Sequence, residues 1–144
     1  MGKYFGTDGF RGEANVNLTA MHAFKVGRFL GWYYGRFHKC SVVIGKDTRR
    51  SSYMFEDALS AGLTSTGADV YLLHVTTTPS VSYVVRTEDF DCGIMISASH
   101  NPYYDNGIKL INGNGEKMEQ EVIDKVEEYL DGDFDDVPYA TMDK

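Results

Sequence analysis

Hydrophobic residues recur along the chain with two different periods, which predicts helices and strands in alternation. Helical spacing of apolar residues predicts four helices, over about 19–37, 52–66, 78–86 and 117–130. Thr19 is placed to cap the first helix, Gly67 to end the second, and Thr78 to cap the third ahead of Pro79. Short apolar runs predict strands at 42–44, 70–73 and 92–96, and shorter strands are expected at 3–5 and 108–110.

The alternation of these elements is typical of an α/β layered sandwich. We expect a mixed, mostly parallel sheet of about four strands flanked by helices. Asn106–Gly107 is a strong turn signal, so the strand that follows it is expected to be antiparallel. We expect residues 1–130 to form one α/β domain, and residues 131–144 to form an acidic linker towards later domains.

The composition, 42% hydrophobic and 24% charged, is ordinary for a soluble globular protein. No apolar run approaches the roughly 20 residues of a membrane span, so no membrane partner is expected. The first residues lack the apolar region of a signal peptide, which favours a cytoplasmic location. Cys40 and Cys92 lie far apart and in no CxxC pair, so we expect buried thiols rather than a disulfide or a zinc site.

Negative charge is concentrated towards the end of the chain. Residues 116–144 carry 11 acidic and 3 basic side chains, a net charge of −8. Residues 1–115 carry 11 basic and 10 acidic side chains and are therefore close to neutral. A neutral body with an acidic tail makes nucleic acid an unsuitable partner, although a local cluster of Lys and Arg can still bind a small phosphorylated ligand.

Candidate chemistry gathers just after the apolar run 92–96, where small and polar residues follow a buried strand. Pro102 stops any helix there, so the segment must be a shaped loop at a strand end, where open α/β sheets place ligand sites. The Ser99 hydroxyl is a candidate phosphate carrier, the alternative being that Ser97 and Ser99 only bond their own loop. A hydrolase using Ser99 and His100 is disfavoured, because adjacent residues of an extended segment point to opposite sides and no GxSxG elbow is present.

Three basic residues are further candidates for contact with an anion. Lys109 lies on the short strand after the loop, where it either points to solvent or neutralises a phosphate. Arg11 lies in Gly6–Gly12, whose three glycines permit close backbone approach to an anion, an ordinary turn being the alternative. Arg49 follows a strand end, and a solvated charge is an equally good interpretation.

These segments resemble a known family. Ala98–Pro102 followed by Asp105–Lys109 resembles the phosphoserine loop of the α-D-phosphohexomutases. Phe5–Gly12, Ile44–Arg49 and Ala61–Val70 agree with other family segments in the same order, and the chain looks most like the phosphoglucosamine branch. Family members are several times longer, so the resemblance implies an N-terminal domain that has little or no activity alone.

The resemblance implies roles for individual residues. Ser99 corresponds to the phosphate carrier and, through its phosphate, to one ligand of Mg²⁺, whose other ligands belong to later domains. Lys109 corresponds to the residue that assists proton transfer. From the residues alone we expect His100 to donate to the phosphate or to pin the loop, with a satisfied structural histidine as the alternative. The catalytic set implied by the family is Ser99, Lys109, His100 and Arg11, and the substrate-binding set is Thr7, Arg11, Asn101 and Arg49.

The implied reaction passes a phosphate from Ser99 to a hexose phosphate and takes the other phosphate back. In the phosphoglucosamine branch this interconverts glucosamine 6-phosphate and glucosamine 1-phosphate. A phosphomannomutase or phosphoglucomutase of the same family, and a non-catalytic sugar-phosphate-binding or phosphoacceptor module, are the alternatives. Expected partners are the hexose phosphate, the remaining domains of the polypeptide, and a second copy of the chain, since the first helix is apolar beyond one stripe.

The string Asp131–Asp135 shares five positions with the magnesium loop of the family, Asp-Gly-Asp-x-Asp-Arg. Asp136 stands where that loop has arginine, and the string follows a predicted helix instead of a buried strand. We therefore expect an acidic linker at this point rather than a metal site.

Overall fold

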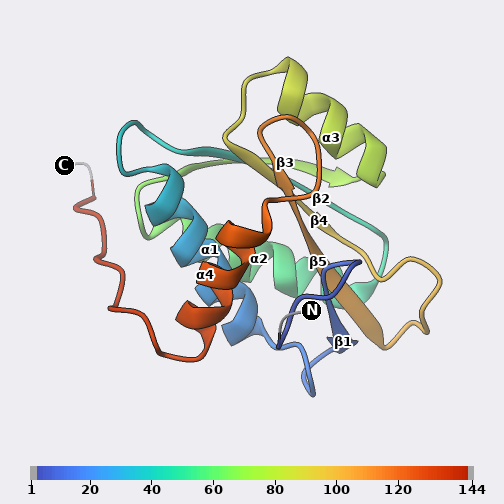
Figure 1. Cartoon of the computed structure of the whole chain (residues 1–144). Helices are drawn as coiled ribbons and strands as arrows, with labels where there is room; N and C mark the ends of the chain where they lie inside the picture. The colour runs from blue at the N-terminus through green and yellow to red at the C-terminus, as the bar shows by residue number, and fades with distance from the viewer. Residues whose placement is uncertain (1–2, 143–144) are drawn as a thin grey trace.

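The computed structural model describes residues 3–142, which form an α/β sandwich around one five-stranded sheet (Figure 1). In chain order the elements are β1 Phe10–Glu13, α1 Ala20–Tyr34, β2 Ser41–Lys46, α2 Arg50–Thr64, β3 Asp69–Val75, α3 Thr78–Thr87, β4 Cys92–Ile96, β5 Asp105–Asn112 and α4 Gln120–Leu130. The strands lie in the order β1-β5-β4-β2-β3. The mixed α/β class expected from the sequence is confirmed, with one strand more than predicted.

The sheet is parallel in one half and antiparallel in the other. β2 pairs in parallel with β3 and β4, whereas β5 runs antiparallel to both β4 and β1. The antiparallel strand expected after Asn106 is therefore confirmed, and it extends over residues 105–112. The expected strand at 3–5 is wrong: the first strand of the described chain is β1, which overlaps the segment interpreted as a glycine-rich turn and ends one residue beyond it. Phe10 is buried and pairs with Ile108, so the edge of β5 supplies the partner that this strand requires.

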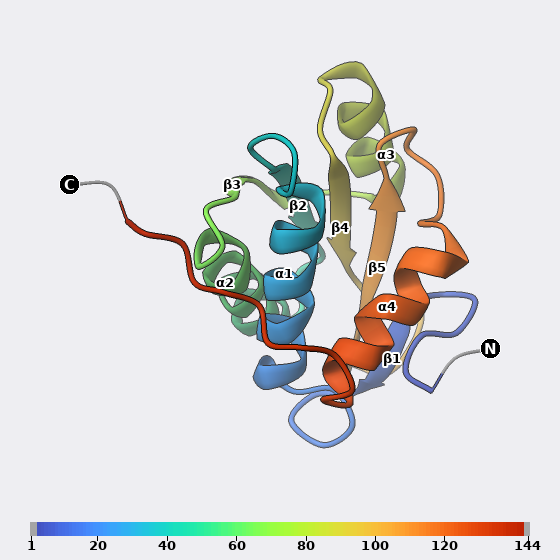
Figure 2. The same cartoon turned by 60° about the vertical axis from the view of Figure 1, so that its left-hand side comes forward.

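Helices cover both faces of the sheet, and each face has its own buried cluster. On one face α1, α2 and α4 pack on strand residues such as Ile44, Ile94 and Ile108. On the other face α3 packs on the alternate residues, among them Val43 and Met95 (Figure 2). Because side chains alternate across a strand, central strands covered on both faces read as continuous apolar runs, as β2 and β4 do.

The ends of the helices follow their capping residues. The Thr19 side chain accepts a hydrogen bond from the His22 N–H, and the Thr19 N–H donates to His22 Nδ1, which forms a capping box at the start of α1. The helix ends at Tyr34, three residues before the predicted end, and Phe37 beyond it is 87% exposed. α3 is capped by Thr77, one residue earlier than expected.

Residues 131–142, the described part of the acidic segment after α4, form no helix or strand, yet they lie along α1 and α2 (Figure 2). The buried Arg28 guanidinium donates to the Val137 carbonyl and to the Ser65 hydroxyl, and it stacks 3.8 Å from the Tyr139 ring centroid. The Ala140 N–H also donates to the Ser65 carbonyl, at 2.8 Å. The segment is thus packed against the domain as far as residue 140, and the domain boundary predicted after residue 130 stays a prediction. Among the helices of residues 3–142, none is long and apolar enough to cross a membrane.

Candidate functional site

The loop between β4 and β5 is shaped by backbone hydrogen bonds. As β4 ends, the Ser97 N–H donates to the Gly107 carbonyl at 2.9 Å. Two turns follow, closed by bonds from the Asn101 N–H to the Ala98 carbonyl and from the Asp105 N–H to the Pro102 carbonyl, both 3.0 Å. The loop that Pro102 predicted is therefore present, and it returns the chain directly into β5.

Ser99 lies in this loop in the left-handed region, with φ at +55°. For a residue with a side chain this conformation costs roughly 1–2 kcal/mol, so neighbouring groups must hold it. One of them is Ser97, whose hydroxyl accepts from the Ser99 N–H at 3.0 Å. The alternative in which these serines bond their own loop is therefore observed for Ser97, whereas Ser99 is exposed.

Arg49 braces the same loop from the end of β2. Its Nη2 donates to the Ser99 carbonyl at 3.1 Å and to the Asn101 carbonyl at 2.7 Å, and its Nη1 pairs with Asp47. The Asn101 side chain in turn donates to Asp105 at 3.3 Å. The two Nη groups are thus engaged by the loop backbone and by Asp47, whereas the buried Nε has no hydrogen-bond partner within residues 3–142. Contact between Arg49 and a substrate stays a prediction.

Asp47 and Asn106 belong to this arrangement, although the sequence analysis missed both. The Asp47 carboxylate accepts from the Arg49 N–H at 3.0 Å and from the Ser52 hydroxyl at 2.6 Å. Asn106 is fully buried and donates to the hydroxyls of Ser51 and Ser52, at 2.8 and 3.0 Å. Asn106 had only been interpreted as a turn residue, and its full burial is visible only in the fold.

Two cations share one face of the sheet next to the loop. Arg11 pairs with Gly107 across the β1–β5 ladder, and Lys109 lies two residues further along β5, hence on the same face. A side chain at Gly107 would meet Arg11 Cγ at 3.0 Å and the Ser97 carbonyl at 2.7 Å, so glycine leaves room for the arginine. Within residues 3–142 the buried Arg11 Nε has no hydrogen-bond partner.

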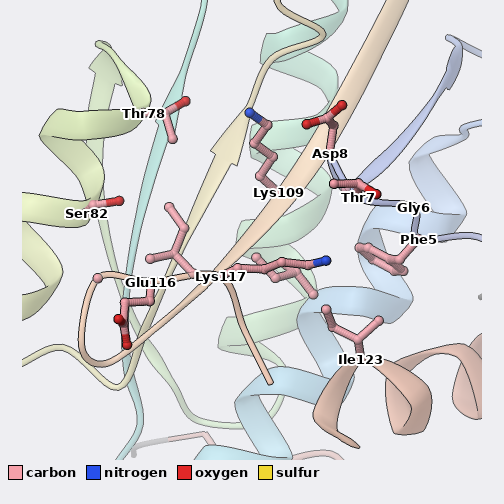
Figure 3. A pocket seen from close by; sticks show the side chains of 14 residues that line it. Phe5, Gly6, Thr7, Asp8, Thr78, Ser82, Lys109, Glu116, Lys117 and Ile123 are labelled. Atoms are coloured by element: carbon pink, nitrogen blue, oxygen red, sulfur yellow. The ribbon is translucent and has the colours of Figure 1, made fainter. Parts of the chain in front are cut away.

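Lys109 also lines a cavity of about 200 Å³ (Figure 3). Figure 3 shows Lys109 and Asp8 near one end of this cavity, with Thr78 and Ser82 of α3 opposite them. Of the predicted residues only Thr7 and Lys109 line it, so the structure groups the others elsewhere. Hydrogen bonds from Arg49 to the loop backbone bring Ser99, Asn101 and Arg49 together. Arg11 lies opposite Gly107, just after the loop, and His100 is exposed in the middle of the loop.

No group of three or more His, Cys, Asp or Glu side chains in residues 3–142 could hold a metal ion. Asp131 accepts hydrogen bonds from Tyr4 and Lys3, at 2.6 and 2.9 Å, and these bonds hold the pKa of its carboxyl below the usual value. The side chains of the described part of the chain therefore do not by themselves form the octahedral cage of oxygens that Mg²⁺ prefers. Cys40 and Cys92 are free and buried, as expected, and burial raises the pKa of both thiols.

The chain matches known proteins over nearly its whole length. Residues 2–135 match the sequence model of the family described as Phosphoglucomutase/phosphomannomutase, alpha/beta/alpha domain I. The chain is 75% identical to a phosphoglucosamine mutase of Lachnospira eligens over 99% of its length, and 52% identical to that of Caldicellulosiruptor bescii. In both cases it spans 32% of the relative, so about a third of the curated relatives' length is present.

A solved structure agrees as well. The crystal structure of a Thermus thermophilus protein described as a phosphomannomutase superposes with a TM-score of 0.77 at 33% identity. The match covers 85% of this chain and 28% of that one. The family match, which takes in nearly the whole chain, agrees with the resemblance of the serine loop. The chain therefore belongs to the phosphoglucomutase/phosphomannomutase family, of which it is an alpha/beta/alpha domain I.

Proposed function

We propose that this chain is the N-terminal domain of a phosphosugar mutase that interconverts glucosamine 6-phosphate and glucosamine 1-phosphate through a phosphoserine at Ser99. One observation carries the proposal: an exposed serine with a left-handed backbone, braced by hydrogen bonds, lies in the loop that leads directly into β5, the strand that bears Lys109 and pairs with Arg11. The names of the 75% and 74% identical relatives support glucosamine phosphate over other hexose phosphates. Since those relatives are about three times longer, turnover is assigned to the longer protein.

In the proposed reaction a sugar hydroxyl attacks the phosphorus of phosphoserine, and the bond from phosphorus to the Ser99 oxygen breaks. The sugar hydroxyl gives up its proton, and the Ser99 oxygen regains one. Lys109 is the proposed proton carrier, a role worth about 10²–10⁴-fold in rate. The bisphosphorylated sugar then reorients and returns its other phosphate to Ser99, so the sugar is isomerised and the enzyme is regenerated.

The charge of phosphoserine, close to −2 at neutral pH, must be neutralised for this transfer. Arg11 and Lys109 are the proposed cations, with Thr7, Asn101 and His100 as neighbouring contacts for the substrate or its phosphate. A bound Mg²⁺ supplies further neutralisation of phosphate charge in such reactions, and this domain offers it one ligand, a phosphate oxygen on Ser99. The other ligands are proposed to come from later domains.

Association of two copies is also proposed, but α1 supports it less than expected. Trp32, Tyr33 and Tyr34 pack against the core of the same chain. The edge strand β3 instead exposes Tyr71 and Val75, 53% and 52% respectively, and an exposed apolar edge favours pairing with another copy. Light scattering over a range of concentrations tests this, and a monomer throughout contradicts it.

The function itself is tested in the full-length protein with three matched variants. Peptide mapping of native enzyme should find phosphate on Ser99, and Ser99→Ala should lose nearly all turnover of glucosamine 6-phosphate while keeping its fold. Ser60→Ala is the control, because the Ser60 hydroxyl is buried and has no hydrogen-bond partner in the described chain. Ser97→Ala should leave the phosphate on Ser99.

Two outcomes contradict the proposal. Phosphate found on Ser97, or normal turnover by Ser99→Ala, would mean that the carrier is misassigned. Labelling of Ser99 by a fluorophosphonate would instead favour a hydrolase, because it requires an activated serine nucleophile. Assays with mannose and glucose phosphates in parallel decide between the branches of the family.

A further inference from the structure

A series of hydrogen bonds centred on Asp47 runs behind the Ser99 loop, and the proposed reaction gives it no role. Asp47 directly follows β2, and its N–H donates to the Ile96 carbonyl at 3.0 Å, which ties the ends of β2 and β4 together. One carboxylate oxygen accepts from the Arg49 N–H and the Ser52 hydroxyl, while the other pairs with the Arg49 guanidinium. Two sets of hydrogen bonds thus start at the Asp47 carboxylate, one through Arg49 and one through Ser52.

The first set of bonds reaches the middle of the loop through Arg49. Its guanidinium donates to the carbonyls of Ser99 and Asn101, the residues on either side of His100. The side chains of Arg49 and Asp47 are only 13% and 22% exposed, so the ion pair is partly shielded from water. Because a guanidinium is planar with donors in fixed directions, the carboxylate that orients one side also orients the other.

The second set of hydrogen bonds runs from Asp47 through Ser52 to Asn106, just after the loop. The Ser52 hydroxyl donates to Asp47 and accepts from Asn106, and both Ser52 and Asn106 are fully buried. Asn106 is the second residue of β5, directly after the loop. The middle of the loop and the strand that follows it are therefore linked to the same carboxylate, although Asn106 lies 54 residues from Ser52 in the sequence.

We infer that Asp47 is a positioning residue for phosphoryl transfer, holding the loop in the conformation that presents the Ser99 oxygen. This inference rests on the proposed function, because the residue that these hydrogen bonds orient is Ser99, the proposed phosphate carrier. Ser99 keeps a left-handed backbone that a non-glycine residue rarely adopts, so the surroundings must enforce it. Asp47 acts through Arg49 and Ser52, and a misplacement of about 1 Å at a reacting group can cost about 100-fold in rate.

The test uses the full-length protein and the variants Asp47→Asn, Arg49→Ala and their combination. The control is Asp57→Asn, which removes the same charge from an exposed position on α2. Asp47→Asn should lower kcat about 10- to 100-fold with little change in KM, because the loop geometry rather than sugar binding is lost. Hydrogen exchange should speed up at the amides of residues 97–105 and stay unchanged in the central strands, and Asp57→Asn should match the parent protein.

The double variant tests the route through Arg49. Since both residues act on the same two carbonyls, while Asp47 also acts through Ser52, Asp47→Asn should cost clearly less in the Arg49→Ala background than in the parent protein. Fully additive losses, exchange that rises throughout the domain, or a parental kcat and loop exchange in Asp47→Asn would each overturn the inference. A normal Ser99→Ala enzyme overturns the proposed function and this inference with it, whereas an inactive Ser99→Ala beside a normal Asp47→Asn overturns the inference alone.

Discussion

Lys46 and Glu56 form a buried ion pair whose disruption should destabilise the domain strongly. Lys46 is the last residue of β2, and Glu56 faces it from α2. Their side chains are only 1% and 5% exposed, and Lys46 Nζ lies 2.9 Å from both carboxylate oxygens. The ammonium also lies 4.3 Å from the Tyr53 ring centroid and 3.4 Å from His74 Nδ1. Both charges are thus removed from water and depend on each other.

Glu56→Gln keeps the shape of the side chain and removes its charge, which leaves a buried ammonium without compensation. Removing one partner of a buried pair typically costs about 3–5 kcal/mol. For a chain of this size each kcal/mol lowers Tm by roughly 2–4 °C, so Tm should fall by roughly 6–20 °C. Replacing both residues, as Lys46→Met with Glu56→Leu, removes both buried charges and should restore most of the loss.

The assay is urea unfolding of the chain followed by circular dichroism, with m-values checked for two-state behaviour. The matched control is Glu121→Gln, which breaks an exposed pair with Lys125 at 3.7 Å and should cost no more than about 0.5 kcal/mol. If Glu56→Gln costs no more than this control, the pair is not desolvated and the reasoning is refuted. A double variant less stable than Glu56→Gln would refute it equally.

Three further predictions concern packing, thiol reactivity and proton transfer. Gly62→Ala should cost at least about 1–3 kcal/mol in urea unfolding, because its Cβ would lie 2.2 Å from the Phe24 carbonyl oxygen and force α1 and α2 apart. Cys40 and Cys92 should resist iodoacetamide at pH 8 until urea unfolds the chain, because burial raises the pKa of Cys40 to about 12 and that of Cys92 well above its usual value. In the full-length protein Lys109→Ala should lower kcat about 10²–10⁴-fold and retain phosphate on Ser99, and a parental kcat would remove Lys109 from the mechanism.

Much of the fold could be predicted because most helices and strands bury apolar residues that recur at regular spacing. The four helices lie within a few residues of the predicted ranges, since each has apolar residues at helical spacing that cover the sheet. The central strands β2 and β4 are covered on both sides and therefore read as continuous apolar runs. Errors fall at helix ends, as at Tyr34, where the apolar residues that follow do not lie over the sheet.

The site could be predicted only in part, because its geometry depends on contacts between distant segments. The loop of Ser99 was predicted from Pro102 and from the resemblance to the phosphohexomutases. The left-handed conformation of Ser99 and the contact between Arg49 and its carbonyl were not, since neither follows from a periodic pattern. Polar residues such as Asp47 and Asn106 look like ordinary turn formers until the fold brings them together.

The strand that the hydrophobic pattern missed, β1, carries Arg11 to the edge of β5 next to the serine loop. Gly9 has φ at +91°, and a side chain there would lie 2.4 Å from the Ile108 carbonyl oxygen. Gly107 likewise has no room for a side chain, because Arg11 and the Ser97 carbonyl occupy that space. Glycines at these points let β1 approach β5 closely enough to set a guanidinium beside the foot of the serine loop. β1 itself spans only Phe10–Glu13 and has Phe10 as its one apolar residue, so it lacks the apolar alternation by which a strand is recognised from sequence. The close approach that Gly9 and Gly107 permit, rather than a hydrophobic pattern, therefore positions this strand.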